Sequence, residues 1–382
     1  MYHLRGDNNQ LFCFMQPNQI HCPVDHVKAD FPFPQKNLQP VIDFLNSNAP
    51  LPAINTAFPV GTITADGRLD MCKQQLGIRG LEQVAIPLMN NQVVKHLLLG
   101  TNAFGNVGAA AVAKLVAANH SIETVYLGCN YIEQEGCKAI CEAVEVSPSV
   151  KSIWFKRNPI GAESMPAIIK MLSGNKQLRT LDLVNTRAGE GFYILFEYME
   201  QNDSVERLYL SGNFLTANTM KYVGKMLARN KHLKSLYLSV NNIGDEGVAA
   251  LIPGLAVNST LEELSLASCG ITGKGMELLF TTLQTNDNLK SLDLGYAPST
   301  KVLEAKANEL SDASAALLVE LIERRPNLIN LNLGKMSLPE VERNRLIEAM
   351  SRRNGSLEMS RYQSEKTYPA HADSIAIKSV YR

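Results

Sequence analysis

The feature that most constrains this chain is a pattern that returns about every 28 residues from Val94 onward. Each copy begins with an apolar residue, has further apolar residues three and five positions later, and usually has an asparagine eight positions later. The copies begin at Val94, Ile122, Val150, Leu178, Val205, Leu233, Leu261, Leu289 and Leu328. The last interval is 39 residues, which indicates an insertion of eleven (39 − 28). A chain that repeats at this spacing is expected to form a solenoid.

The pattern predicts one short strand and one helix in each copy. Because the second and third apolar positions are two residues apart, both point to one face of a strand, and the residue between them points to the other face. The remainder of a copy, for example 247–255, has apolar residues every three or four positions, as an amphipathic helix does. One copy cannot bury its apolar face alone, but stacked copies share a continuous core. We therefore expect parallel strands covered on one face by helices.

The copies resemble leucine-rich repeats of the ribonuclease-inhibitor type, which also occur in the Ran GTPase-activating protein. Residues 94–102 and 233–243 carry the resemblance, with leucine and asparagine in the expected places. The resemblance implies an α/β fold, a leucine-rich-repeat horseshoe solenoid with parallel β-strands on the concave face and α-helices on the convex face. Ribonuclease inhibitor is much richer in cysteine than this chain, which has seven, and the acidic tail of the Ran activator is missing. Neither specific activity is therefore expected.

The sequence predicts three regions. Residues 66–358 hold about ten repeats, the first of which is degenerate and has Gln74 in the place of the asparagine. Residues 1–65 do not repeat, and we expect an N-terminal cap with a β-hairpin around 16–19 and a short helix near 38–45. Residues 359–382 form a polar C-terminal tail. The insertion, residues 296–306, is expected to emerge as a loop at one edge, where it is either a binding element or a neutral expansion.

Polar side chains recur at the turns in phase with the pattern. The asparagine after each strand has an amide that can bind backbone groups where the chain turns inward, and Thr186 and Cys269 replace it in two copies. Asp245 and Ser311 are expected to cap the amino ends of helices. A second series of asparagines stands where helices are expected to end, in the left-handed backbone conformation. Its members are Asn119, Asn175, Asn202, Asn230, Asn258, Asn286 and Asn354.

Composition excludes several classes of partner. The 37 basic and 37 acidic residues balance, so no overall field favours nucleic acid or an anionic membrane, and neither is expected as a partner. No stretch has the apolar core of a signal peptide or the length of a membrane span. Scattered cysteines form no disulfide framework, so we expect a cytoplasmic protein. The alternative is a secreted effector without a cleaved N-terminal signal.

The sequence offers no enzyme motif. It has no signature of a serine hydrolase, a metalloprotease or a dinucleotide-binding enzyme, so we expect a non-enzymatic protein without catalytic residues, a metal or another cofactor. Cys13 and Cys22 fall opposite each other across the predicted hairpin, with His21 and His26 nearby. Without a Cys-x-x-Cys pair, two buried thiols are expected there rather than a zinc site.

The strand face opposite the core carries the most informative side chains. The residue that points there from each strand is, in chain order, Asp70, Leu98, Tyr126, Trp154, Asp182, Tyr209, Tyr237, Ser265, Asp293 and Asn332. Four of five neighbouring strands therefore present an aromatic ring at a strand spacing of about 4.8 Å. We expect two aromatic pairs with Asp182 between them, bordered by Lys156, Arg157 and Arg207, with Glu263 and Asp293 in the acidic second half.

Aromatic and arginine side chains are favoured in the centres of protein interfaces, so this face is expected to bind an unknown protein partner. The expected partner-binding residues are Tyr126, Trp154, Lys156, Arg157, Asp182, Arg207, Tyr209, Tyr237, Asp293 and, in the insertion, Tyr296. A face that is solvated or covered by a terminal segment remains open as an alternative. Three other functions also remain open: a GTPase-activating protein of the Ran-activator type, a bacterial effector delivered to a host cell, and a purely structural array.

Overall fold

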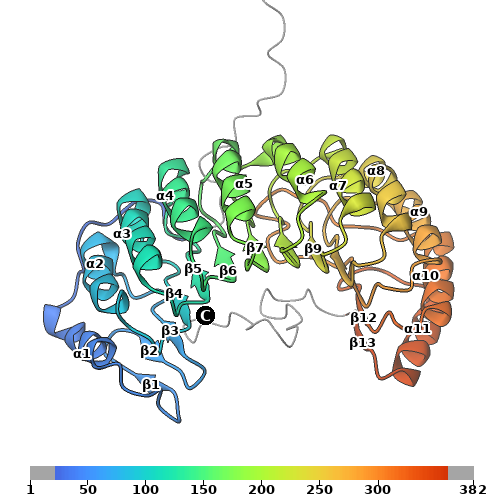
Figure 1. Ribbon diagram of the computed structural model, residues 1–382. Coiled ribbons are helices and arrows are strands. Elements are labelled where there is room, and N and C mark those ends of the chain that lie inside the picture. The colour runs from blue at the N-terminus through green and yellow to red at the C-terminus, as the bar shows by residue number, and fades with distance from the viewer. Residues whose placement is uncertain (1–21, 360–382) are drawn as a thin grey trace, which may run out of the picture.

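The computed structural model describes residues 22–359. Figure 1 shows an arc in which the helices line the outer side and the strands line the inner side. This arrangement confirms the predicted α/β horseshoe solenoid. Two layers follow from the sequence because each copy supplies one strand and one helix, and each must bury its apolar face against the other.

The described strands form a single 13-stranded sheet in chain order. From β3 (Arg68–Asp70) to β13 (Ser356–Glu358), neighbouring strands are parallel. The strands between them are β4 (His96–Leu98), β5 (Thr124–Tyr126), β6 (Ser152–Trp154), β7 (Thr180–Asp182), β8 (Arg207–Tyr209), β9 (Ser235–Tyr237), β10 (Glu263–Ser265), β11 (Ser291–Asp293) and β12 (Asn330–Asn332). Each lies at the position that the repeated pattern predicted.

The N-terminal end of the sheet differs from the prediction. Strand β2 (Thr62–Ile63) pairs antiparallel with β3, and β1 (Thr56–Ala57) pairs antiparallel with β2, so both extend the sheet. Helix α1 (Gln39–Ser47) confirms the short helix predicted in this region. The hairpin predicted around 16–19 lies mostly outside the described residues, and 22–24 do not form a strand.

Ten further helices of the described residues cover the sheet (Figure 1). They are α2 (Gly77–Leu88), α3 (Gly105–Ala118), α4 (Gln134–Glu145), α5 (Met165–Gly174), α6 (Tyr193–Met199), α7 (Ala217–Arg229), α8 (Gly244–Val257), α9 (Gly273–Leu283), α10 (Asp312–Arg324) and α11 (Glu340–Arg352). The main core lies between the two layers, where strand residues such as Leu236 and helix residues such as Leu251 are fully buried. Burying one such leucine stabilises the fold by about 1.5–3 kcal/mol.

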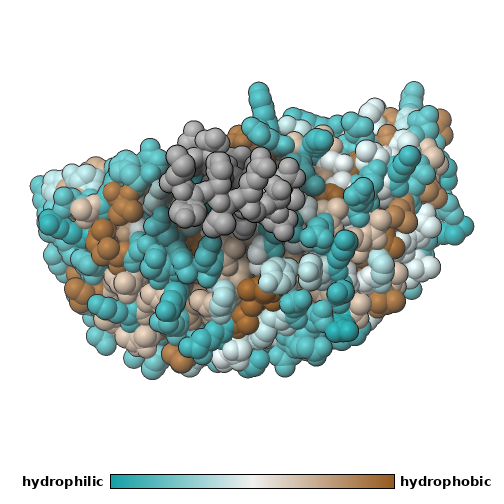
Figure 2. Space-filling view, turned by 90° about the horizontal axis from the view of Figure 1, so that it is seen from above, coloured by the Kyte–Doolittle hydropathy of each residue, from teal (hydrophilic) through white to brown (hydrophobic). Residues whose placement is uncertain are grey.

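The outer surface of the helices is chemically mixed. Figure 2, seen from above, shows hydrophobic residues interspersed among hydrophilic ones. Exposed apolar side chains there include Ile86, Val146 and Val257, which belong to different repeats. Apolar residues scattered in this way are normal on a folded surface and do not indicate a docking face.

The asparagines that follow the strands form a ladder between repeats. Asn130 Nδ2 donates to Leu99 O and to Leu127 O, each at 2.9 Å. Its Oδ1 accepts from Asn102 N at 2.7 Å and from Ala103 N at 3.1 Å. One side chain thus satisfies backbone groups of its own repeat and of the preceding one. Equivalent bonds are made by Asn102, Asn158, Asn213 and Asn241.

Three positions of this ladder depart from the rule. Thr186 Oγ1 donates to Leu183 O at 2.9 Å, and Cys269 Sγ donates to Leu238 O at 3.4 Å, so each keeps one donor in place of the amide. After β11, the ladder position is taken by Asn308, which donates to Leu294 O at 2.9 Å. The insertion therefore stands between a strand and its ladder asparagine, as the spacing predicted.

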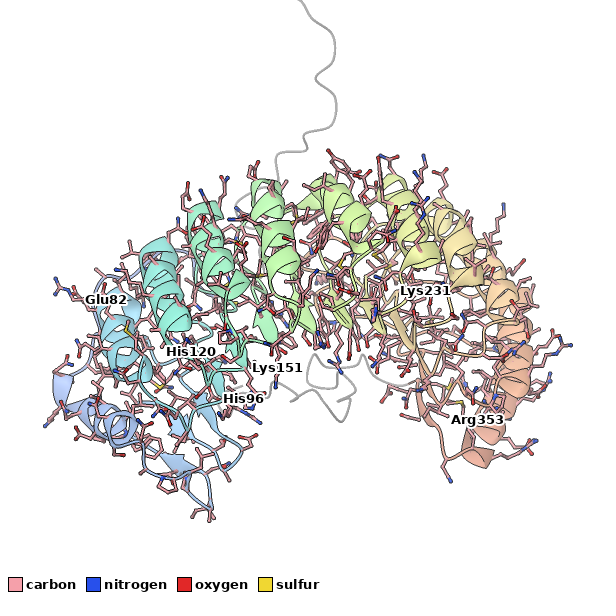
Figure 3. The ribbon with its side chains drawn as sticks, in the orientation of Figure 1. Glu82, His96, His120, Lys151, Lys231 and Arg353 are labelled. Atoms are coloured by element: carbon pink, nitrogen blue, oxygen red, sulfur yellow. The ribbon has the colours of Figure 1, made fainter. Side chains whose placement is uncertain are left out.

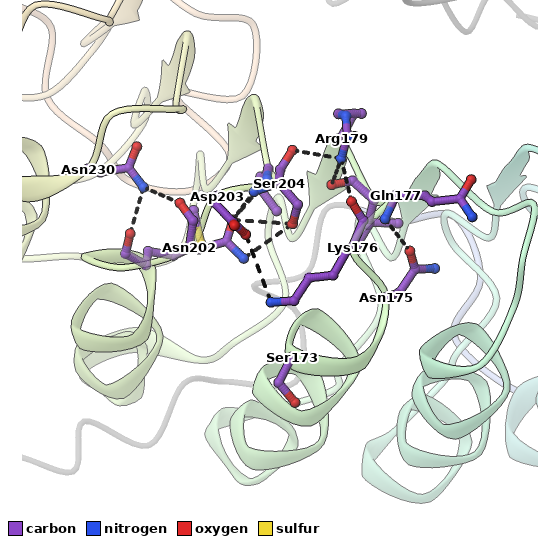
Figure 4. Close-up of polar contacts among 12 residues, drawn as sticks. Ser173, Asn175, Lys176, Gln177, Arg179, Asn202, Asp203, Ser204 and Asn230 are labelled. Carbon is purple, nitrogen blue, oxygen red and sulfur yellow. Dashed lines mark hydrogen bonds and ion pairs between the residues drawn. The ribbon is translucent and has the colours of Figure 1, made fainter.

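The second series of asparagines acts through its side chains rather than through a left-handed backbone. Asn119 and Asn230 are extended, with φ of −90° and −67°, so the predicted conformation is wrong for them. Asn230 Nδ2 donates to Asn202 O at 3.0 Å, and its Oδ1 accepts from Leu233 N at 2.7 Å. Figure 4 shows this contact between neighbouring repeats. Asn354, at the last repeat, does have a positive φ of 53°.

The two predicted helix caps have different outcomes. Ser311 caps α10, where its side chain accepts from Ser314 N at 3.0 Å. Asp245 does not cap α8; its carboxylate instead accepts from the backbone N–H (2.8 Å) and the hydroxyl (2.6 Å) of Thr272 in the next repeat. Because neighbouring repeats stack closely in a solenoid, a side chain at the start of a helix can bond the next repeat as readily as its own helix.

The insertion forms no helix or strand and packs against earlier repeats. Leu303 is buried, and a Cβ at Gly212 would lie 2.8 Å from its Cδ1. Thr300 Oγ1 donates to Ser268 Oγ at 2.6 Å. Lys306 N donates to Asn242 Oδ1 at 3.1 Å. The insertion thus lies along the edge of the solenoid at which strands β8 to β10 end, which we call the turn edge.

Candidate functional site

The predicted aromatic side chains lie side by side on the strand face opposite the main core. The strand register aligns Tyr126 with Trp154, Trp154 with Asp182, Asp182 with Tyr209, and Tyr209 with Tyr237. Ring centroids are separated by 6.1 Å between Tyr126 and Trp154 and by 4.4 Å between Tyr209 and Tyr237. We call these four residues the aromatic row.

The aromatic row is continuous rather than divided into two pairs. The centroids of Trp154 and Tyr209 are 5.2 Å apart although β7 lies between their strands. Asp182, on β7, was predicted to separate the pairs. Its side chain is much shorter than an indole or a phenol, so the two larger rings meet beyond it. This contact could not be predicted from strand spacing alone.

The aromatic row is buried, which corrects the expectation of an open face. Its four side chains have exposed fractions of only 3–7% and form a second apolar cluster with Leu98, Cys72 and Val184. Rings held 4.4–6.1 Å apart cover one another. Tyr126 also lies over Gly100 and Gly128, where an added Cβ would meet its ring or hydroxyl at 2.5–2.8 Å. The main core is therefore not the only apolar cluster in the repeats.

A polar row lies beside the aromatic row and was largely missed in the sequence. The first residue of each strand also points to this face, because side chains alternate along a strand. His96 Nδ1 lies 3.0 Å from Thr124 Oγ1 in this row, and Tyr237 donates its hydroxyl to Glu263. Figure 3 shows His96 and Lys151 on the strand side of the arc. The same two-residue alternation would have identified the whole row.

The basic side chains predicted to border the aromatic row lie at opposite ends of the strands. Lys156 and Arg157 follow β6 at the turn edge; Lys156 is buried and Arg157 is half-buried. Arg207 begins β8 at the other edge and is buried, with its guanidinium nitrogen 3.6 Å from the Glu206 carboxylate. Positive charge therefore flanks the aromatic row on both sides.

The acidic half of the face is satisfied by internal hydrogen bonds. The Asp293 carboxylate accepts from Ser265 Oγ at 2.9 Å, Asn332 Nδ2 at 2.8 Å and Gly295 N at 3.2 Å. Burial raises the pKa of Asp293 above its usual range, against the effect of these bonds. Burial likewise raises the pKa of Tyr209. The acidic half is thus held together by polar contacts rather than by ring contacts.

Tyr296 is not part of the aromatic row. Its backbone N–H donates to Gly334 O at 2.9 Å, and the ammonium group of Lys335 lies 4.4 Å from its ring centroid. The start of the insertion is therefore placed against the last repeat, beyond the acidic half of the face.

Two buried donors beside the aromatic row have no acceptor among the described residues. They are Nε1 of Trp154 and Nε of Arg207. Leaving a donor buried without an acceptor costs about 1–3 kcal/mol. A bound molecule that brings an oxygen atom to either donor would recover part of that cost.

Within the described residues, no group of three or more histidine, cysteine, aspartate or glutamate side chains could hold a metal ion. None of the helices in the described part of the chain combines the length and apolar character needed to cross a membrane.

Comparison with known proteins identifies the repeats. The family model described as "Leucine Rich repeat" matches residues 118–141, 229–251 and 257–280. These are leucine-rich repeats. Each matched segment runs from the end of one helix through the next strand to the beginning of the following helix. The matches therefore follow the alternation of strands and helices in the solenoid. A search of curated proteins finds no match to this leucine-rich-repeat chain.

Solved structures share distant similarity with these leucine-rich repeats. The leiomodin-1 actin-binding site 2 is 19% identical, with coverage of 50% of this chain and 96% of that chain and a TM-score of 0.34. A protein from Bacteroides fragilis is 14% identical, with coverage of 75% and 71% and a TM-score of 0.40. The tropomodulin C-terminal domain from Caenorhabditis elegans is 16% identical, with coverage of 49% and 90% and a TM-score of 0.31. Similarity at this level carries no information about function.

Proposed function

We propose that this leucine-rich-repeat chain is a protein-binding module and that its partner contacts the aromatic row. The observation that carries the proposal is the continuous stack from Tyr126 to Tyr237 on the face away from the main core. Large rings of this kind dominate the binding energy of many protein interfaces. On the helix side, the exposed apolar residues of the described part of the chain are scattered (Figure 2), which does not favour docking there.

The side chains around the aromatic row suggest the chemistry of the partner. Trp154 Nε1 and Arg207 Nε are buried donors that lack an acceptor among the described residues, so a partner that supplies oxygen atoms gains at both positions. Lys156 and Arg157 add positive charge at the turn edge. We propose a polypeptide segment whose carbonyl or carboxylate oxygens meet these donors and whose apolar side chains pack on the rings.

The proposal is tested with a captured and purified partner. The immobilised full chain captures binding proteins, mass spectrometry identifies them, and calorimetry measures the Kd of the purified partner for each variant. Trp154→Phe keeps an aromatic ring but removes the donor, so we expect a loss of about 0.5–1.5 kcal/mol in binding. Trp154→Ala removes the ring as well and should cost about 2 kcal/mol or more.

Controls separate binding from folding. Because Trp154 is buried between two rings, Trp154→Ala is expected to lower stability too, and Trp154→Phe is the cleaner test of the interface. Tyr193→Ala, on the outer side of α6, removes an exposed ring and should leave the Kd unchanged. If Trp154→Phe and Trp154→Ala both bind the partner as the unaltered chain does, the aromatic row is not the interface.

A further inference from the structure

Residues 22–30 lie across the turn edge of the first repeats and are held there by backbone hydrogen bonds. Lys28 N donates to Ala103 O at 2.8 Å, and Lys28 O accepts from Ile78 N at 2.9 Å. The Val27 side chain lies against Gly105, where an added Cβ would meet it at 2.5 Å. We call residues 22–30 the edge segment.

The edge segment begins with a cysteine that meets a second cysteine from the repeats. Cys129 lies in the turn after β5, has a positive φ of 59° and is only 6% exposed. The half-buried Cys22 donates its thiol hydrogen to the Cys129 sulfur. Val24 N donates to Cys22 Sγ at 3.4 Å, which orients this thiol. Arg157, from the next turn along, also donates to Cys129.

We propose that Cys22 and Cys129 are a redox-active pair that hydrogen peroxide converts into a disulfide, which tethers the edge segment to the repeat that contains β5. The two thiols are already in contact, so no large movement is needed to bring the sulfurs together. One of them is shielded in a turn and the other is half-exposed, so a small oxidant can reach the pair.

The chemistry balances with peroxide as the only co-reactant. The Cys129 thiolate attacks one peroxide oxygen, so that an S–O bond forms, the O–O bond breaks and hydroxide leaves as water after taking a proton. The Cys22 thiol then loses its proton and attacks the Cys129 sulfur, so that the S–S bond forms and the S–O bond breaks. The second hydroxide leaves as water. Two thiols and one peroxide thus give one disulfide and two waters.

The surroundings of the pair assign the two roles. The hydrogen bond from Cys22, together with the charges of Arg157 and Lys156, lowers the pKa of Cys129 to about 7. The same hydrogen bond and burial raise the pKa of Cys22. Cys129 is therefore the sulfur that attacks peroxide, because the thiolate is the reactive form, and Cys22 is the sulfur that resolves the sulfenic acid.

A second cysteine pair provides an internal comparison. Cys137 and Cys141 lie on α4 with their sulfurs 3.9 Å apart, and both are buried. The hydrogen bond that Cys141 donates to Cys137, together with burial, raises the pKa of Cys141 well above its usual range. This pair is therefore expected to stay reduced under conditions that oxidise Cys22 and Cys129.

The test uses the purified, reduced full chain and hydrogen peroxide in slight excess. After remaining thiols are alkylated and the chain is digested with trypsin, fragment spectra of the peptides report which cysteines are joined. We expect the peptide 6–28 to be linked to the peptide 115–138 through Cys22 and Cys129, with Cys137 alkylated. Because Cys13 shares the first peptide, Cys13→Ser is included and should leave the link intact.

Two variants and a pH series complete the test. Cys22→Ser should stop the reaction at the Cys129 sulfenic acid, which dimedone captures, whereas Cys129→Ser should abolish both products. The rate of Cys129 alkylation should reach half of its maximum near pH 7, the pKa of about 7 of this thiol. The proposal is overturned if Cys22 and Cys129 are recovered separately alkylated, or if the link persists in Cys129→Ser.

Discussion

The substitution Asn130→Ala tests the ladder that joins neighbouring repeats. The side chain is fully buried and makes four hydrogen bonds of 2.7–3.1 Å, to Leu99 O, Leu127 O, Asn102 N and Ala103 N. Alanine keeps the bond from Asn130 N to the next ladder asparagine but removes these four side-chain bonds.

The magnitude follows from the number of bonds. A buried hydrogen bond contributes about 0.5–1.5 kcal/mol net, so four bonds correspond to about 2–6 kcal/mol. The backbone partners stay buried without a new partner, which places the expected loss in the upper half of that range. Asn130→Thr should lose less, because Thr186 already stands at a ladder position and keeps one bond to a strand carbonyl.

The assay is equilibrium unfolding in urea, followed by circular dichroism and by the fluorescence of Trp154, the one tryptophan of the chain. Asn218→Ala is the matched control because Asn218 is exposed and its amide is 3.5 Å from its partner, Glu190. We expect the control to differ from the unaltered chain by less than about 0.5 kcal/mol. If Asn130→Ala lost no more than this control, the ladder would not hold the repeats together.

Two further substitutions and one deletion test other parts of the account. Leu236→Ala removes a fully buried strand side chain and should cost about 2–5 kcal/mol; an unchanged melting temperature would mean that the strand assignment is wrong. Deleting 296–306 should lower the melting temperature, because buried Leu303 alone is worth about 1.5–3 kcal/mol, and equal stability would show that the insertion does not contribute to packing. Burial raises the pKa of Asp293, so the intact chain should lose stability as pH rises from about 4 through that pKa. Asp293→Asn has no titrating carboxyl at this position and should lack this loss. In urea unfolding at several pH values, its stability should therefore rise relative to that of the intact chain as the pH increases. A stability difference between the two chains that stays constant with pH would contradict the raised pKa.

The fold was predictable because the pattern carries two periods at once. A repeat of 28 residues predicts a solenoid, and the two-residue alternation within each strand fixes which side chains face the core. This is why the aligned positions of Tyr126, Trp154 and Tyr237 could be predicted correctly. The strands β1 and β2 could not, because they are two residues long and stand outside the repeat.

The details of the candidate site depend on side-chain size and on contacts between distant residues. Trp154 contacts Tyr209 because both side chains are longer than that of Asp182, which lies between their strands. Strand spacing alone does not predict this contact. The meeting of Cys22 with Cys129 depends on the path of a segment that does not repeat. The burial of the aromatic row likewise could not be predicted from alternation, which gives the direction of a side chain but not its exposure.

The most direct test of the central proposal is a fluorine NMR titration of the chain labelled with 5-fluorotryptophan. One tryptophan gives one resonance, at the centre of the aromatic row, and an unlabelled partner adds no signal. The account predicts that the resonance of Trp154 shifts and saturates at the partner concentration at which calorimetry finds binding. Binding detected by calorimetry while this resonance stays unchanged would contradict it.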